Sequence, residues 1–71
     1  MKGSELLRRL RRFARLHEMH CQFVAERGKG SHGTVYLNDR RATIRNLKDE
    51  LKPGTLHAML KQLGIEESDL H

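Results

Sequence analysis

Hydrophobic residues recur at helical spacing near the start of the chain. One side of the helix predicted over residues 4–17 carries Leu6, Leu7, Leu10, Phe13, Ala14 and His17. The opposite side carries Arg8, Arg11, Arg12 and Arg15. This pattern predicts an amphipathic helix whose apolar side packs on a core. Ser4 is the expected N-cap residue, because its side-chain oxygen can accept a hydrogen bond from a free N–H of the first turn.

The middle of the chain predicts three strands, over residues 21–27, 31–37 and 40–45. The second of these segments is rich in β-branched and aromatic residues, and each is bounded by turn-forming residues. Gly28 and Gly30 mark the turn after the first strand. Asn38 and Asp39 predict a two-residue hairpin turn between the second and third strands, since both residue types tolerate positive φ.

This short turn fixes how the second and third strands pair. The predicted pairs are Leu37–Arg40, Tyr36–Arg41, Val35–Ala42, Thr34–Thr43, Gly33–Ile44 and His32–Arg45. Because side chains alternate along a strand, one face then carries Val35, Leu37, Ala42 and Ile44, which we expect to pack against helices. The other face carries His32, Thr34, Tyr36, Arg41, Thr43 and Arg45, and we expect it to be polar, basic and open.

A second helix is predicted to begin at Pro53 and to stop at Gly64, after an apolar stripe of Leu56, Met59, Leu60 and Leu63. Ile65 is expected to make the hydrophobic contact that follows such a stop, and residues 66–70 to add a short turn. The order α-β-β-β-α predicts an α+β fold, a two-layer sandwich with both helices on one face of a three-stranded antiparallel sheet. Double-stranded RNA-binding domains share this architecture.

Length and charge limit the possible partners. Seventy-one residues make one domain, 1–71, whose core supplies only roughly 3–5 kcal/mol. Fourteen Lys and Arg residues against nine Asp and Glu give a net charge of +5. This balance indicates an anionic partner: nucleic acid, an acidic protein or an anionic membrane surface. Low aromatic content argues against proteins that stack many bases of a single strand.

The cellular compartment is expected to be the cytoplasm. Cys21 is the one cysteine, so an internal disulfide is excluded. No apolar run approaches the roughly 20 residues that a transmembrane helix needs. The N-terminus also lacks the apolar segment of a secretory signal peptide.

Motifs before the predicted hairpin and along the second predicted helix resemble a known family. The segment 27–32 reads Arg-Gly-Lys-Gly-Ser-His, Gly54-Thr55-Leu56 opens the second helix, and residues 60–65 read Leu-Lys-Gln-Leu-Gly-Ile. From Ser4 to Ile65 the chain resembles the HicA mRNA interferase toxin family. The resemblance implies a fold like that of double-stranded RNA-binding domains, cleavage of mRNA without a metal or other cofactor, and neutralisation by a HicB antitoxin.

The resemblance makes His32 the catalytic histidine, with Gly30 and Ser31 as the motif residues that position it. An imidazole can take the proton of a ribose 2′-hydroxyl near neutral pH, as metal-free RNA cleavage requires. Without the resemblance, His32 reads as a surface histidine at a glycine-flanked strand start. The chain departs from many members in lacking a second histidine after the third strand, where it reads Thr43-Ile44-Arg45-Asn46-Leu47, and its first helix and the connection after it are longer.

Several other residues are candidates for binding RNA phosphates. Arg45 is the first candidate because it pairs with His32 in the predicted register, followed by Arg41 and Lys29. Tyr36 can stack on a base or donate a hydrogen bond. On the first helix the candidates are Arg8, Arg11, Arg12 and Arg15, for RNA phosphates or for an acidic antitoxin surface. Each of these residues, taken singly, also fits an ordinary solvated surface position. A HicB-like antitoxin is expected to cover the His32 face.

The sequence is also compatible with two other functions. The same fold can serve as a non-catalytic module that binds structured RNA, and the missing second histidine keeps that alternative open. An interaction or DNA-binding protein, with the basic helix docked in a groove, is the third possibility. His17, His20 and Cys21 are close in sequence, but no fourth ligand is evident, so no metal site is expected.

Overall fold

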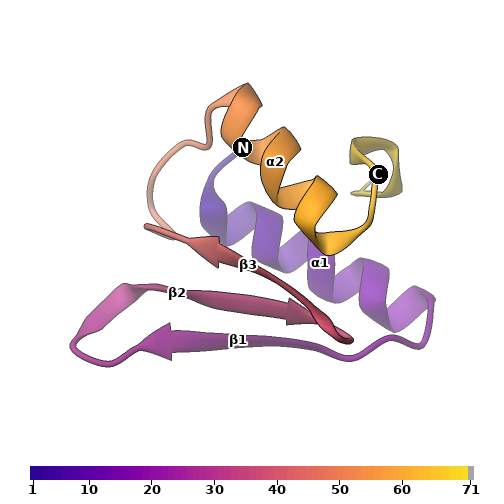
Figure 1. Cartoon of the computed structure of the whole chain (residues 1–71), viewed down its shortest axis with the longest axis horizontal. Coiled ribbons are helices and arrows are strands. Elements are labelled where there is room, and N and C mark those ends of the chain that lie inside the picture. Colours follow the sequence, from indigo (N-terminus) through magenta and orange to yellow (C-terminus); the bar gives the residue numbers. More distant parts are fainter. Residues whose placement is uncertain (71) are drawn as a thin grey trace.

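The computed structural model describes residues 1–70, with Lys29 described by its backbone alone. Its elements, in chain order, are α1 (Gly3–Leu16), β1 (Cys21–Glu26), β2 (Lys29–Leu37), β3 (Arg40–Ile44), α2 (Pro53–Leu63) and the 3-10 helix η1 (Glu67–Leu70) (Figure 1). The predicted α-β-β-β-α order and the α+β class are confirmed. His71 lies outside the described residues.

The first helix buries its leucine-rich side, as predicted. Leu6 and Leu10 are fully buried, and Ala14 is nearly so. His17, which was expected on this side, is instead exposed. It follows the last residue of α1 as the C-cap, and its ring centroid lies 4.3 Å from that of Phe13. The imidazole therefore stacks on the edge of the core rather than entering it.

The expectation that Ser4 caps this helix is wrong. The helix begins one residue earlier, with Lys2 as the N-cap residue and no side-chain cap. The amide of Gly3 donates a hydrogen bond to the carbonyl of Asp49 (3.1 Å), and the amide of Ser4 donates to the carbonyl of Leu47 (2.8 Å). The segment after β3 thus supplies the acceptors that free N–H groups of a helix start require.

The sheet has the order β1-β2-β3, and both neighbouring pairs are antiparallel. The predicted β2–β3 register is confirmed from Leu37–Arg40 to Gly33–Ile44. Asn38 adopts the expected positive φ, 54°, in the turn between these strands. The expected pair of His32 with Arg45 is wrong, because the ladder ends at Ile44, where the chain leaves β3.

The turn between β1 and β2 is tighter than predicted, and a bulge follows it. Lys29 already pairs with Glu26, while the next pair joins Ala25 to Gly33. Residues 30–32 of β2 lie between these two pairs, have no partner on β1 and form the bulge. A Cβ atom on Gly33 would lie 2.3 Å from the carbonyl oxygen of Val24. Only glycine therefore lets β1 approach this closely beside the bulge.

The second helix starts and ends as predicted. Pro53 is its first residue, and Gly64 follows its end with a φ of 77°. The amide of Gly64 donates to the carbonyl of Lys61 (3.1 Å), and the amide of Ile65 donates to that of Leu60 (3.1 Å). This is the pattern of a left-handed helix cap, with Ile65 packed against the core beside it.

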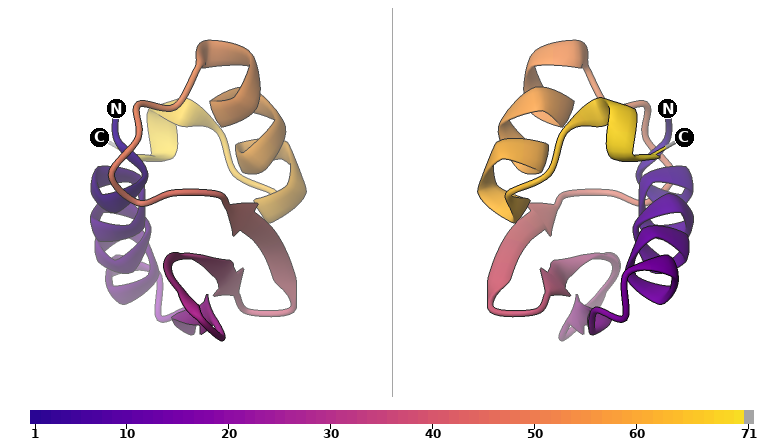
Figure 2. Two further views of the ribbon diagram at one scale, coloured as in Figure 1. Left: turned by 90° about the vertical axis from the view of Figure 1, so that its left-hand side faces the viewer. Right: turned by 90° about the vertical axis from the view of Figure 1, so that its right-hand side faces the viewer.

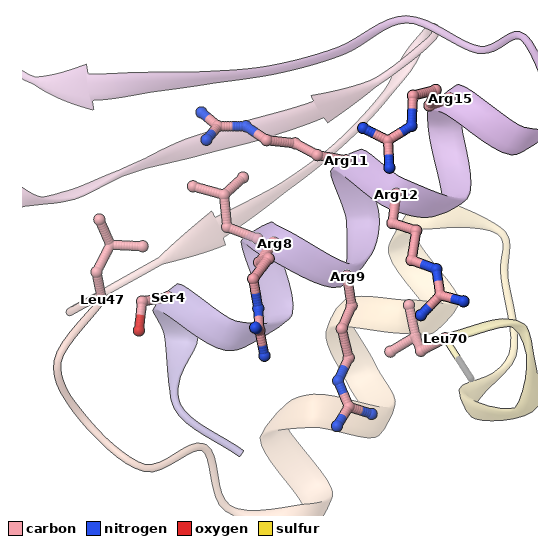
Figure 3. Close-up of a pocket in the computed structure, with 9 residues that line it drawn as sticks. Ser4, Arg8, Arg9, Arg11, Arg12, Arg15, Leu47 and Leu70 are labelled. Carbon is pink, nitrogen blue, oxygen red and sulfur yellow. The ribbon is translucent and has the colours of Figure 1, made fainter.

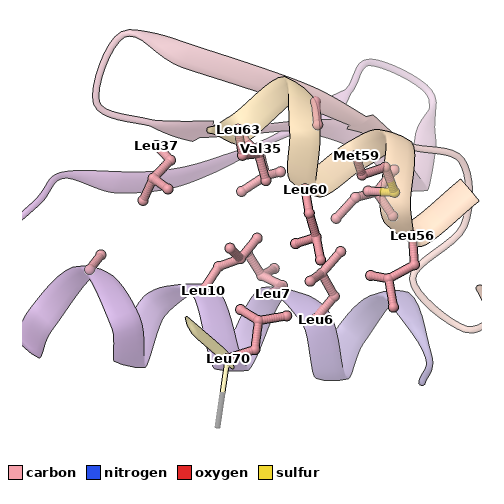
Figure 4. Packing of buried hydrophobic residues seen from close by; sticks show 13 residues of the cluster. Leu6, Leu7, Leu10, Val35, Leu37, Leu56, Met59, Leu60, Leu63 and Leu70 are labelled. Carbon is pink, nitrogen blue, oxygen red and sulfur yellow. The ribbon is translucent and has the colours of Figure 1, made fainter. Parts of the chain in front are cut away.

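The core lies between the helices and one face of the sheet. Figure 2 shows both helices on the same side of the curved sheet. The helix α1 packs on β1 and β2, and α2 packs on β3. Leucines of both helices and of η1 meet Val35 and Leu37 of β2 in the interior (Figure 4). The opposite face of the sheet carries no helix within residues 1–70 and remains open.

Replacing Gly33 with alanine is expected to lower the free energy of unfolding by about 1–3 kcal/mol, because the added methyl group collides with the backbone of β1. Urea titration followed by circular dichroism measures the change. The matched control is Gly54→Ala in α2, where a Cβ atom meets nothing within 4 Å. There we expect a gain of up to about 1 kcal/mol, since alanine favours helix. Equal stability of the wild type and Gly33→Ala would contradict this packing.

Candidate functional site

The bulge of β2 places His32 on the open face of the sheet. Its side chain is 30% exposed, so the ring is accessible yet held on several sides. The carbonyl of Ser31 accepts a hydrogen bond from the amide of Leu47 (2.9 Å), which ties the bulge to the segment after β3. A Cβ atom on Gly30 would meet nothing within 4 Å, so packing among the described residues does not require glycine there.

A carboxylate holds one side of the His32 ring. The Nδ1 atom of His32 lies 3.0 Å from Oε2 of Glu26, whose side chain is 49% exposed. A neutral imidazole in this contact donates its hydrogen from Nδ1 and keeps a free lone pair on Nε2. The contact therefore fixes which ring nitrogen is available to accept a proton.

This pairing follows from the register of the first hairpin. Ala25 lies opposite Gly33, and Glu26 pairs with Lys29 on the other side of the bulge. The bulge, which contains residues 30–32, thus lies directly beside Glu26 and brings its carboxylate to the His32 ring. The sequence prediction missed Glu26 because it did not pair the first strand with the second. The position of Glu26 at the end of a strand, before a glycine turn that leads to His32, is the signal that was available.

Two further rows of side chains cross the open face beside His32. Val24, Thr34 and Thr43 are paired across the three strands in the first row. Gln22, Tyr36 and Arg41 are paired in the second row. The predicted neighbourhood of Tyr36 and Arg41 is thus confirmed, whereas Val24 was not a predicted site residue.

The predicted phosphate-binding residues of the sheet are only partly brought together. Arg41 is exposed on β3, opposite Tyr36. Arg45 is exposed just past the end of β3 and is not opposite His32 in the ladder. Lys29 is the first residue of β2, and its side chain lies outside what the structure describes.

The arginines of α1 form a separate cationic surface. We call it the α1 arginine surface; it comprises Arg8, Arg9, Arg11, Arg12 and Arg15 (Figure 3). These side chains surround a shallow hollow of about 830 Å³ that Leu47 and Leu70 border. Arg9, which the sequence prediction omitted, pairs with Glu5 at 3.0 Å, and Arg8 pairs with the same carboxylate at 3.5 Å. This hollow shares no lining residue with the pocket at His32.

Among residues 1–70 no three His, Cys, Asp or Glu side chains are grouped so as to hold a metal ion. His17 stacks on Phe13, and Nε2 of His20 lies 3.4 Å from the side-chain oxygen of Gln22. Burial raises the pKa of the Cys21 thiol, and the nearby charge of Arg11 opposes that shift. A thiol with a raised pKa is less often ionised and is a weaker nucleophile at neutral pH.

A family model described as "HicA toxin of bacterial toxin-antitoxin" matches residues 3–65. The chain belongs to the HicA toxin family. No curated protein and no solved structure matches it. Membership gives this HicA chain a toxin role and, in general terms, an antitoxin partner. Over the part that the structure describes, none of the helices has the length and apolar character needed to cross a membrane.

The neutral ring of His32 is expected to carry its hydrogen on Nδ1, because Glu26 accepts a hydrogen bond there. Long-range ¹H–¹⁵N NMR spectra distinguish the two ring tautomers. Glu26→Ala is expected to move His32 toward the Nε2–H tautomer, which an unrestrained imidazole favours. Glu67→Ala, which removes an exposed carboxylate from η1, is the control and should leave the ring signals unchanged. A wild-type ring that already carries its hydrogen on Nε2 would contradict the contact.

Proposed function

We propose that this HicA chain is an endoribonuclease that cleaves mRNA, and so inhibits translation, with His32 as the general base. The observation that supports this function most is the contact between the His32 ring and Glu26. Glu26 holds its Nδ1 atom, and the ring is partly exposed on the open face of the sheet. Nε2 is thereby left to meet a substrate that approaches this face.

The proposed reaction needs only one base at the attacking side. Nε2 of His32 takes the proton of a ribose 2′-hydroxyl, and the 2′ oxygen attacks the adjacent phosphorus. The bond from phosphorus to the 5′ oxygen then breaks. The products are a 2′,3′-cyclic phosphate and a 5′-hydroxyl, whose proton comes from water. Since a side chain supplies the base, this scheme includes no step at a metal ion.

Glu26 acts as a positioning residue in this scheme. The attacking and leaving oxygens lie on opposite sides of the phosphorus, so a carboxylate in contact with the His32 ring cannot serve the leaving side. Its role is to orient the imidazole and to stabilise the imidazolium that forms when Nε2 takes the proton. The contact is half exposed, and water screens part of this stabilisation.

His20 does not supply the missing second imidazole. Its amide donates a hydrogen bond to the side chain of Asn38, at the β2–β3 turn. Asn38 follows His32 by six positions along the strand, which is about 20 Å of extended chain. His20 is therefore too far away to act on the same phosphate.

Cations on the open face would stabilise the negative charge that grows on the phosphate oxygens. Arg41, Arg45 and Lys29 are the proposed residues, and Gly30 and Ser31 are proposed to position His32. The α1 arginine surface is proposed to bind the RNA backbone farther from the scissile bond. A HicB-like antitoxin would then neutralise the toxin by covering the His32 face. Action on mRNA places the proposed activity in the cytoplasm.

A non-catalytic module that binds structured RNA is the second candidate function. The lack of a second histidine near His32, in the chain as far as it is described, favours it. This function predicts tight RNA binding without cleavage, unaffected by loss of the His32 imidazole.

His32→Ala is expected to reduce RNA cleavage by roughly 10²–10⁴-fold, because the general base is lost. Purified protein is incubated with RNA in the presence of a metal chelator, and cleaved ends are counted; growth after induced expression is followed in parallel. His57→Ala is the matched control, since His57 is exposed on α2. Cleavage and growth arrest that persist unchanged in His32→Ala would contradict the assignment.

The double variant Arg12→Gln and Arg15→Gln is expected to bind RNA more weakly and with a shallower salt dependence. Two lost phosphate contacts reduce the slope of log affinity against log salt by about 1.4 on single strands. Titration of fluorescent RNA at several salt concentrations measures this slope. Lys52→Gln with Lys61→Gln removes the same charge at two exposed lysines and is the control. An unchanged slope in the arginine variant would remove RNA binding from the α1 arginine surface.

A further inference from the structure

The open face of the sheet contains a pocket of about 250 Å³ next to His32. We call it the β-face pocket; the side chains of the open face that line it are Val24, Glu26, His32, Thr34, Tyr36 and Thr43. The mechanism proposed above uses His32 and Glu26. It gives no role to the other four side chains.

The register explains the shape of this pocket. Val24, Thr34 and Thr43 pair across the sheet and form its floor. His32 lies two residues before Thr34 on β2, and Tyr36 lies two residues after it. Side chains two residues apart on one face of a strand are separated by about 7 Å. The imidazole and the phenol ring therefore stand at opposite ends of a floor that is one side chain wide.

The side chains of the floor, together with the Tyr36 ring at the end far from His32, have the chemistry to bind a nucleobase. Val24 is a large apolar side chain that is nevertheless exposed, with 46% of its surface accessible. Its methyl groups and the half-buried Tyr36 ring offer apolar contact to a flat ring. The hydroxyls of Thr34 and Thr43 can each donate and accept hydrogen bonds along a base edge. Stacking on an aromatic side chain and hydrogen bonds to base edges are how proteins bind unpaired RNA bases.

The reaction geometry determines which base would enter. The 2′-hydroxyl that gives its proton to His32 belongs to the same ribose as one base. That base must lie within one nucleotide of the imidazole, which is the position of the floor. We propose that the β-face pocket binds the base of the nucleotide whose 2′-hydroxyl attacks, and that this nucleotide must be unpaired. The proposal rests on the proposed nuclease function.

Base pairing would prevent this binding. In an A-form helix each base is stacked between its neighbours, so it cannot reach a pocket on the protein without leaving the stack. The substrate class is therefore RNA that is single-stranded at the cleaved position. Tyr36 is the one aromatic ring among the lining side chains named above besides the imidazole, and one stacking ring serves one base. This agrees with the low aromatic content of the chain, which argues against binding a run of bases.

Binding is tested with RNA that cannot be cleaved. A dodecanucleotide with 2′-fluoro groups at every position lacks the attacking hydroxyl, and it is compared with its duplex. We expect NMR signals of the Val24, Thr34 and Thr43 methyl groups and of the Tyr36 ring to shift with the single strand and not with the duplex. Equal shifts with both forms would overturn the proposal.

Substitutions at Tyr36 and Val24 measure how much each side chain contributes to binding of the single strand. Tyr36→Ala is expected to weaken single-strand binding by roughly 5–100-fold, the loss of one stacked base, whereas Tyr36→Phe keeps the affinity. Val24→Ser is expected to give a smaller loss of single-strand affinity. It tests the pocket on its own if Tyr36→Ala does not fold. The control is Leu16→Ala, which shortens another large exposed apolar side chain, 66% accessible at the end of α1. Unchanged affinity in both Tyr36→Ala and Val24→Ser would overturn the proposal.

The two proposals fail in different ways. If His32→Ala abolishes cleavage but the pocket signals do not respond to RNA, the nuclease function stands and the base pocket is wrong. If the pocket binds single strands but the wild type does not cleave RNA, the nuclease function is wrong, and with it the assignment of the bound base to the attacking nucleotide.

Discussion

The alternation of side chains along β2 governs the chemistry of the whole molecule. Val35 and Leu37 are fully buried against the helices, so the residues of β2 that alternate with them must face the other way. Those residues are Tyr36, Thr34 and His32. Burial of the core thus presents an imidazole, a hydroxyl and a phenol on the open face, and a shift of one residue would bury all three.

Charge is divided between two surfaces of the protein. The α1 arginine surface concentrates positive charge on the helical layer, where Glu5 engages Arg8 and Arg9. On the sheet, by contrast, a carboxylate lies against His32 in a chain whose net charge is +5. An acid at this point weakens attraction for RNA phosphates, so its presence is better explained by what it does to the ring of His32. In the proposed function, the arginines would attract RNA at long range, and Glu26 would orient the imidazole of His32 as general base.

Both proposed functions of the sheet require that its open face stay uncovered in the free toxin. A base in the β-face pocket and a phosphate at His32 would occupy the same few rows of side chains. An antitoxin that covers these rows would block both at once without distorting the fold. The bulge that carries His32 is tied to the segment after β3, because the amide of Leu47 donates a hydrogen bond to the carbonyl of Ser31.

Local patterns in the sequence determined the order of the elements, the β2–β3 register and the buried sides of β2 and β3. They did so because helical and strand periods, a short turn and a glycine helix stop depend on near neighbours in the chain. The resemblance carried by the motif 27–32 also made His32 the candidate catalytic residue. Tertiary structure alone decided that Glu26 contacts His32, that Gly33 must be glycine, and that the segment 46–50 rather than Ser4 caps α1. These features depend on the bulge and on the return of the chain after β3, where residues distant in sequence meet and no local periodicity records the contact.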